Sequence, residues 1–169
     1  MNKFSIWNIF AYINLSLGII SIIFCINGKI MLSCFFILLA SLLDGYNGRL
    51  SRKFCPASSL GRELHSLSDI ISLGTAPAIL LWKLSLSGLG IIGYLILLIF
   101  PICGAYKLAR FNITQVDNVY TGIPITIAGA ALALDGIATK KIGIHTGLTA
   151  ILMLLFSYLM VSTIKFKKI

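Results

Sequence analysis

Asp44–Arg52 reads D-G-Y-N-G-R-L-S-R and Gly61–Asp69 reads G-R-E-L-H-S-L-S-D, with eight residues between the two segments. Each segment adjoins a long apolar run, so its ionisable side chains are predicted to lie near the end of an apolar helix. Such side chains are costly inside a membrane, and those that occur there usually mark a functional site. The two segments therefore predict neighbouring helices that share one polar site.

Most of the chain around these segments is apolar. Hydrophobic residues make up 58% of the 169 residues and charged residues 11%. A soluble domain of this size cannot bury that much apolar surface, whereas a bilayer removes the need. Six apolar runs each approach the ~20 residues that a helix needs to cross the hydrocarbon core. These runs are Ile9–Ile26, Ile30–Arg49, Gly61–Lys83, Leu89–Phe111, Gly122–Thr139 and Gly143–Ile164.

These runs predict an all-α, polytopic membrane protein with six transmembrane helices in a single domain over residues 1–169. The first run is interpreted as a retained span rather than a signal peptide, because it is long and no cleavage site of small residues follows it. With six spans, both termini lie on the same side of the membrane.

The distribution of cations predicts which side faces the cytoplasm. Lys and Arg are enriched in cytoplasmic loops. The side that holds the termini and the motif carries ten cations, and the other side carries Lys29, Lys83, Lys140 and Lys141. We therefore expect both termini and the motif to be cytoplasmic. The net charge of +9 then reflects topology and contact with anionic membrane lipid, and no nucleic-acid partner is expected. The ten cations are Lys3, Arg49, Arg52, Lys53, Arg62, Lys107, Arg110, Lys165, Lys167 and Lys168.

Four polar side chains of the motif are predicted to converge. Helical spacing places Asp44 and Asn47 on one face of the first helix, and His65 and Asp69 on one face of the second. If the two helices pack antiparallel, these faces bring together two carboxylates, an imidazole and a carboxamide. Such clusters suit hard divalent cations such as Mg²⁺ or Mn²⁺, and the imidazole favours Mn²⁺.

Glycines and cations flank this cluster and allow two interpretations. Gly45, Gly48 and Gly61 permit close backbone approach, either to a ligand or to another helix. The neighbouring arginines and lysine can contact phosphate oxygens or serve only as topology anchors. His65 taken alone is often a hydrogen-bonded core residue. The paired carboxylates beside the cations nevertheless favour a phosphate-handling metal site.

The spacing of the motif resembles the signature of the CDP-alcohol phosphatidyltransferase family, D-x2-D-G-x2-A-R-x8-G-x3-D-x3-D. Asp44 and Asp69 stand without a gap at the first and last aspartates. Gly48 and Gly61 stand at the two glycines, and Arg52 stands at the arginine. The predicted six-helix topology with a cytoplasmic N-terminus is also similar to that of this family.

Further segments resemble the branch of the family that makes phosphatidylserine in bacteria. Gly61–Ala78 is similar to that branch's G-x-E-L-D-S-x-A-D-x-x-x-F-G-x-A-P run, and Lys107–Asn112 to its R-L-A-R-F-N run. Thr121–Pro124 and Tyr158–Ser162 resemble parts of its later helices. The resemblance implies transfer of a phosphatidyl group from CDP-diacylglycerol to L-serine with release of CMP. It also implies a homodimer in the bacterial inner membrane, with the active site facing the cytoplasm.

The resemblance assigns roles to individual residues. Divalent cations are expected at the four aspartate positions, which are Asp44, Asn47, His65 and Asp69 here. Asp69 stands where the family has the proposed base that deprotonates the alcohol. The CDP moiety is expected to contact Asp44, Gly48, Ser51, Arg52 and Gly61, and the phosphate or acceptor to contact Lys107 and Arg110.

This chain departs from the signature at Asn47, His65 and Ser51, which replace two aspartates and an alanine, and more mildly at Lys107, which replaces an arginine. Asn47 and a neutral His65 can ligate a cation but add no charge. The site therefore keeps half of the negative charge of four carboxylates, and we expect one ion, or two held weakly. Losing one preorganised electrostatic contact commonly costs ~10²–10³ in rate, so two altered ligands together can abolish turnover.

Three hypotheses follow from the sequence. The first is an active synthase with an altered metal site and Asp69 as base. The second is a family member that binds CDP-diacylglycerol or a partner subunit without catalysis. The third is a small carrier or channel, which is disfavoured because no pair of interrupted helices is evident.

Overall fold

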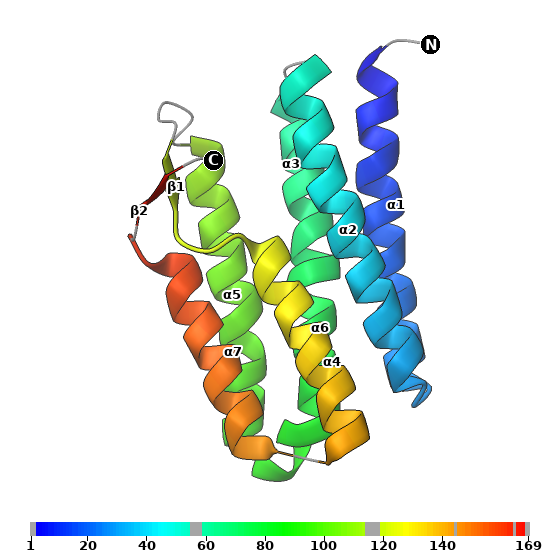
Figure 1. The fold of residues 1–169 in the computed structure, drawn as a ribbon, viewed down its shortest axis with the longest axis vertical. Coiled ribbons are helices and arrows are strands. Elements are labelled where there is room, and N and C mark those ends of the chain that lie inside the picture. The colour runs from blue at the N-terminus through cyan, green and yellow to red at the C-terminus, as the bar shows by residue number, and fades with distance from the viewer. Residues whose placement is uncertain (1–2, 55–58, 114–118, 144, 164, 168–169) are drawn as a thin grey trace.

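The computed structural model describes the backbone of residues 3–54, 59–113, 119–143, 145–163 and 165–167, and the side chains of residues 8–48, 60–113, 122–143 and 145–163. Long helices lie side by side, and α1 and α7 run in opposite directions at two sides of the bundle (Figure 1). The helices are α1 (Lys3–Ile26), α2 (Ile30–Phe54), α3 (Ser59–Asp69), α4 (Ala76–Leu81), α5 (Ile91–Ile113), α6 (Ile125–Ile142) and α7 (Thr146–Val161).

Helices occupy all six of the predicted apolar runs. Four helical segments are long and apolar enough to cross a membrane, and they are Asn8–Ile26, Ile30–Gly48, Leu60–Leu89 and Ile91–Ile113. The helix α7 is apolar but shorter, and α6 carries three charged side chains. The helical membrane protein predicted from composition is thus supported, with four helices that meet the length and hydropathy of a span in the described part of the chain.

Some boundaries differ from those predicted. The third apolar run is part of one continuous helical rod that extends to Leu89. In this rod α3 is followed by the π-helical segment η1 (Ile70–Thr75), then α4, the π-helical segment η2 (Trp82–Leu86) and a final 3₁₀ turn, η3 (Ser87–Leu89). A short antiparallel ribbon of β1 (Val119–Thr121) and β2 (Lys165–Lys167) was not expected from the sequence. The ribbon is a small exception to the all-α class.

The packing of the bundle is typical of a membrane protein. Large apolar side chains such as Leu42, Ile91 and Tyr158 are exposed on its outer surface, whereas small ones such as Ala40, Ala76 and Ala128 are buried between helices. Small residues let helices approach closely when the surrounding lipid is as apolar as the side chains themselves. The exposed apolar surface of the isolated chain is therefore suited to contact with lipid.

Two glycines bring neighbouring helices against η1. A Cβ added to Gly18 of α1 would lie 2.6 Å from Ser72 Cα, and one added to Gly129 of α6 would lie 2.5 Å from Leu73 O. Both distances are shorter than any normal carbon contact, so neither position has room for a side chain. π-helical turns within α-helices are frequent at functional sites, and this one begins directly after Asp69.

Local contacts stabilise the turn that joins α1 to α2, at the end of these helices away from Asp44. Gly28 adopts a positive φ of 73° in the turn, and its N–H donates to Cys25 O. Lys83 Nζ donates to Cys25 O at 2.9 Å and to Ile26 O at 2.7 Å. These bonds satisfy carbonyl groups at the C-terminal end of α1, which have no partner within the helix.

Candidate functional site

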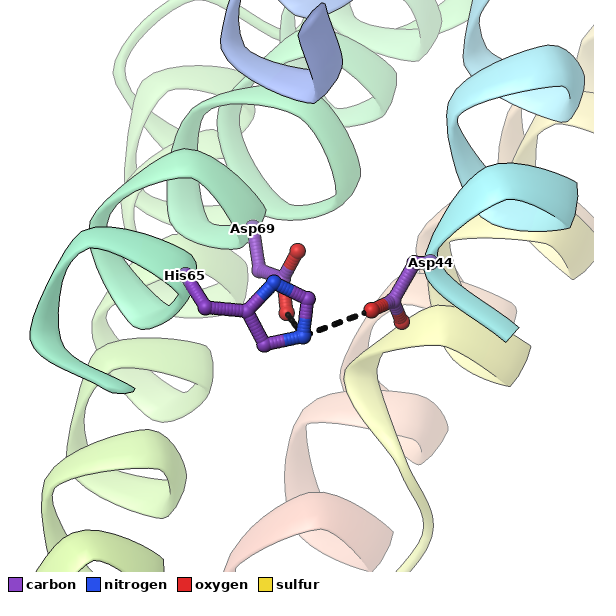
Figure 2. A group of neighbouring side chains, drawn as sticks. All are labelled: Asp44, His65 and Asp69. Carbon is purple, nitrogen blue, oxygen red and sulfur yellow. Dashed lines mark ion pairs between the residues drawn. The ribbon is translucent and has the colours of Figure 1, made fainter. Parts of the chain in front are cut away.

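Three ionisable side chains of the motif meet between α2 and α3. His65 Nε2 lies 2.9 Å from Asp44 Oδ1 and 3.7 Å from Asp69 Oδ2 (Figure 2). One nitrogen or oxygen from each residue lies within 4.8 Å of the others, a spacing that can hold a metal ion. The prediction that the two helices bring these side chains together is thus confirmed.

The cluster is buried on one side and accessible on the other. The side chains of Asp44 and Asp69 are 9% and 5% exposed, whereas that of His65 is 36% exposed. A protonated Nε2 donates a hydrogen bond to the carboxylates, and a deprotonated Nε2 offers its lone pair to a cation. The imidazole therefore stands at the open side of a negatively charged site.

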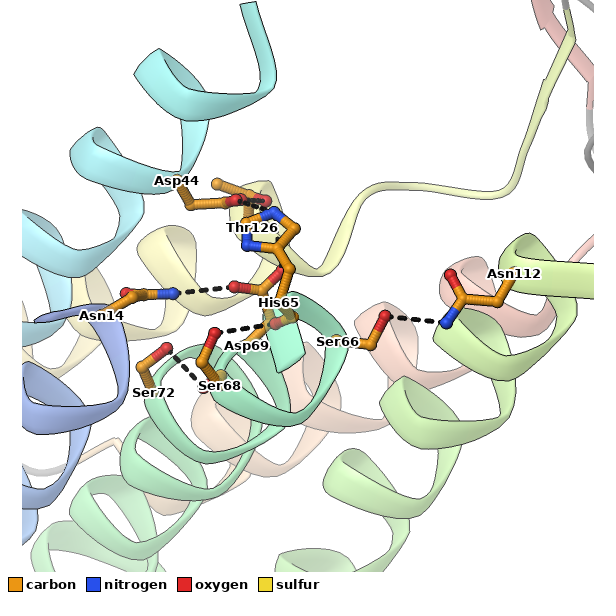
Figure 3. A network of polar contacts seen from close by, with 9 residues as sticks. All are labelled: Asn14, Asp44, His65, Ser66, Ser68, Asp69, Ser72, Asn112 and Thr126. Atoms are coloured by element: carbon orange, nitrogen blue, oxygen red, sulfur yellow. Dashed lines mark hydrogen bonds and ion pairs between the residues drawn. The ribbon is translucent and has the colours of Figure 1, made fainter. Parts of the chain in front are cut away.

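Two residues that sequence reasoning missed hold the carboxylates from other helices. Asn14 Nδ2 of α1 donates to Asp69 Oδ1 at 2.7 Å, and Thr126 Oγ1 of α6 donates to Asp44 Oδ2 (Figure 3). Each of these residues is a polar residue in a largely apolar run, and this is the only sign of them in the sequence. The site therefore draws on four helices rather than on two.

Asn47 lies one helical turn beyond Asp44 and is buried, with 7% of its surface exposed. Its Oδ1 has no hydrogen-bond partner among the described residues. Buried polar atoms are normally paired, so an unpaired amide oxygen needs an explanation. Amide and carboxylate oxygens are ligands that hard divalent cations accept. The side chains present at this site thus fit a divalent cation.

Two glycines of the motif have open space beside them among the described residues. A Cβ added to Gly45 or Gly48 would meet no described atom within 4 Å. Gly61 lies at the start of α3 and is partly exposed. The room beside Gly48 is compatible with the approach of a ligand to the backbone. The side chains of Ser51 and Arg52, and those of Arg49 and Lys53, lie outside the described residues.

The two predicted phosphate or acceptor contacts on α5 bind main-chain carbonyls in the structure. Lys107 is buried, and its Nζ donates to Ile123 O ahead of α6. Arg110 donates to the carbonyls of Val161 and Ser162 at the end of α7, at 3.0 Å and 3.3 Å. These contacts hold the ends of α6 and α7 to α5.

A second polar contact links α5 to the outer face of α3. Asn112 Nδ2 lies 3.2 Å from Glu63 Oε1 and 3.0 Å from Ser66 Oγ. Two serines close to Asp69 along the chain, Ser68 and Ser72, donate to the carbonyls of His65 and Ser68 (Figure 3). Their hydroxyl protons are therefore directed to the backbone rather than to the carboxylates.

A family model for CDP-alcohol phosphatidyltransferases matches residues 4–167, nearly the whole chain. The chain belongs to the CDP-alcohol phosphatidyltransferase family. The matched region contains the cluster formed by Asp44, His65 and Asp69.

Three relatives place the chain more closely within that family. It is 34% identical to the CDP-diacylglycerol–serine O-phosphatidyltransferase of Bacillus subtilis, over 90% of this chain and 84% of the relative. It is also 34% identical to the enzyme of that name from Helicobacter pylori, over 96% of this chain and 73% of the relative. The archaetidylserine synthase of Methanothermobacter thermautotrophicus is 31% identical over 96% of this chain and 69% of the relative. The relatives are thus transferases of phospholipid synthesis whose names specify serine or its lipid product.

Proposed function

We propose that this chain transfers the phosphatidyl group of CDP-diacylglycerol to L-serine, producing phosphatidylserine and CMP. The observation that carries the proposal is the meeting of Asp44, His65 and Asp69 at the family motif. The relatives supply the choice of donor and acceptor, because two of them are named for this reaction.

The nucleotide of the donor is proposed to lie beside the α2 end of the cluster. There Gly48 offers its backbone for close approach, and we assign Asp44, Ser51, Arg52 and Gly61 to the same CDP site by their positions in the family motif. An arginine fork suits a pyrophosphate because it forms two parallel hydrogen bonds to phosphate oxygens. Lys107 and Arg110 are proposed to contact the phosphate or the acceptor, in addition to the carbonyl contacts that they make now.

One divalent cation, Mn²⁺ or Mg²⁺, is proposed to bind Asp44 Oδ1, Asp69 Oδ2 and His65 Nε2, with Asn47 Oδ1 as a further oxygen ligand. The three ionisable groups already lie within a common ligand distance, and the Asn47 oxygen has no described partner. A bound divalent cation would neutralise charge on the pyrophosphate and favour departure of CMP. The imidazole nitrogen among the ligands favours Mn²⁺ over Mg²⁺.

The reaction forms one bond and breaks one bond at the phosphorus of the phosphatidyl group. The serine hydroxyl oxygen bonds to that phosphorus, and the phosphorus–oxygen bond to CMP breaks. Asp69 is proposed to accept the hydroxyl proton, because it stands where the family signature has its proposed base and its carboxylate lies in the cluster. Positioning and electrostatic stabilisation supply most of the catalysis in such transfers.

The setting proposed for this reaction is the cytoplasmic face of a bacterial inner membrane. We propose that all six helices cross the membrane within a single domain, that both termini are cytoplasmic, and that the chain acts as a homodimer. The excess of cations at the motif end supports this orientation.

The proposal is tested by assaying the purified protein for CMP release with CDP-diacylglycerol, L-serine and Mn²⁺. Serine-dependent CMP release together with phosphatidylserine is the expected result. The controls are glycerol phosphate and inositol phosphate as acceptors, and Mg²⁺ and Co²⁺ as cations. Absence of CMP release with every combination would contradict the proposal.

The placement of His65 favours a second candidate, a protein that binds CDP-diacylglycerol without turnover. Because Nε2 lies within reach of both carboxylates, a protonated imidazole can pair with them in place of a cation. This candidate predicts that CDP-diacylglycerol binds and raises the thermal stability of the protein equally with and without Mn²⁺, with no CMP released.

A further inference from the structure

We propose that Asn14 and Thr126 are positioning residues that orient the two carboxylates for binding a divalent cation. The inference rests on the proposed function and extends it from the motif to α1 and α6. Neither residue belongs to the family signature, and each reaches the site from a helix distant in sequence.

Each of the two hydrogen bonds occupies one oxygen of a carboxylate. The second oxygen of each carboxylate then faces His65 Nε2. Asn14 engages Asp69 Oδ1, and the remaining Oδ2 lies 3.7 Å from His65 Nε2. Thr126 engages Asp44 Oδ2, and the remaining Oδ1 lies 2.9 Å from the same nitrogen. Two carboxylate oxygens and one imidazole nitrogen therefore face one another, which is the arrangement that a single ion requires.

The donors are themselves held in place. Asn14 is 1% exposed and lies on a helix that packs against both α2 and α3. Thr126 lies in the first turn of α6, the helix that packs along α2. A side chain on a packed helix loses little further freedom when it orients a ligand, and such outer-shell partners typically change metal affinity 10–100-fold.

The glycine contacts explain why these donors reach the site. Gly18 follows Asn14 by one helical turn, and Gly129 follows Thr126 by three residues. Both glycines pack directly on η1, the segment that continues the helix from Asp69. The close approach of α1 and α6 to η1 therefore places the two donors beside the carboxylates. Larger side chains at either glycine would displace the donors outward.

The experiment measures Mn²⁺ binding to the full-length protein by electron paramagnetic resonance, without substrate. The variants Asn14→Leu and Thr126→Val remove the donors and nearly preserve side-chain size. We expect each to weaken Mn²⁺ binding about 10–100-fold. Thr126→Ser keeps the hydroxyl and is expected to retain most of the parent's affinity. If Asn14→Leu or Thr126→Val does not fold, Asn14→Ala and Thr126→Ala provide the same comparison.

Thr149→Val is the matched control. Thr149 Oγ1 donates to Asp135 Oδ2 at 2.9 Å, so this variant removes the same kind of hydrogen bond between α7 and α6, outside the cluster. It is expected to leave Mn²⁺ binding unchanged. The inference is overturned if the parent binds no Mn²⁺, if the donor variants bind it as tightly as the parent does, or if Thr149→Val weakens binding equally. If the donor variants lose affinity but the parent releases no CMP with serine, the positioning role stands and the proposed reaction fails.

Discussion

Two hydrogen bonds of the same kind, at different places along α6, have different surroundings. Thr126 donates to Asp44, and Asp135 accepts from Thr149. The second oxygen of Asp44 faces His65, with Asp69 beyond it. Asp135 forms no ion pair within the described side chains, and its carboxylate is not part of a group that can hold a metal ion. An acid within an apolar helical bundle therefore indicates a functional site most strongly where a second acid and an imidazole converge on it.

The two places also differ in how the helices meet. Near the cluster, Gly18 and Gly129 leave no room for a side chain, whereas a Cβ added to Gly147 at the start of α7 would meet no described atom within 4 Å. Close packing thus accompanies the converging side chains of the cluster. Substitutions at each place can separate the effect of the converging acids from the effect of close packing.

The largest effect is expected from removing a converging acid. Asp69→Asn should lower the rate of CMP release by ~10²–10³, because it removes a charged ligand and the proposed base. Asp135→Asn removes an acid from the same bundle and should leave the rate close to that of the parent. Steady-state assays of both variants, with thermal unfolding to show that each is folded, check this prediction. Equal losses in the two variants would show that the cluster has no special role.

Restoring charge to the cluster should increase activity. Replacing Asn47 and His65 together by Asp returns the two missing carboxylates, and we expect the rate with Mn²⁺ or Mg²⁺ to rise at least ~10-fold, since one such contact is commonly worth more than that. The single variants Asn47→Asp and His65→Asp serve as controls. A folded double variant with unchanged or lower activity would show that these two positions do not ligate the cation.

Packing at the cluster should be sensitive to one added methyl group. Gly129→Ala places a carbon against Leu73 O and should lower the free energy of unfolding by about 1–3 kcal/mol. Gly147→Ala adds the same methyl group in open space, and its stability should equal or slightly exceed that of the parent. Thermal unfolding of both proteins in detergent compares them, and a more stable Gly129→Ala variant would contradict the close contact.

The smallest effect is expected at the end of α1. Lys83→Met removes the donor to Cys25 O and Ile26 O and should lower stability by about 0.3–1 kcal/mol, the usual contribution of a cation at a helix C-terminus. Activity should not change, because the contact lies outside the cluster. Lys83→Arg, which keeps a cation and a hydrogen-bond donor at the same position, is the control and should retain most of the parent's stability. A loss of activity in Lys83→Met would link this end of the bundle to the site.

The sequence predicted the part of the site that depends on spacing along neighbouring helices. Asp44, His65 and Asp69 were placed on facing stripes, and helical geometry was sufficient to bring them together. Asn14 and Thr126 were not predicted, because they lie 55 and 82 residues from the acids they contact, and one sequence does not specify which faces of distant helices meet.

Fold details were missed for a related reason. The π-helical segment η1 has no local sequence signal, since its geometry depends on helices packed around it. The strands β1 and β2 are each three residues long and stable only through their mutual pairing across the chain. Hydropathy predicted six helices at the right places, but α7 is short and α6 carries three charged side chains, so neither meets the length and hydropathy of a span as α1, α2 and α5 do.

The position of Thr126 has a consequence for the biosynthesis of the protein. Synthesis proceeds from the N-terminus, so Asn14, Asp44 and Asp69 emerge from the ribosome well before α6 does. In the nascent chain Asp69 can already accept its hydrogen bond from α1, whereas Asp44 can accept its own only after α6 has been made. A translation arrest before α6 would therefore leave both acids present but only one of them oriented, and the proposed cation site would be completed only after α6 has packed against the earlier helices.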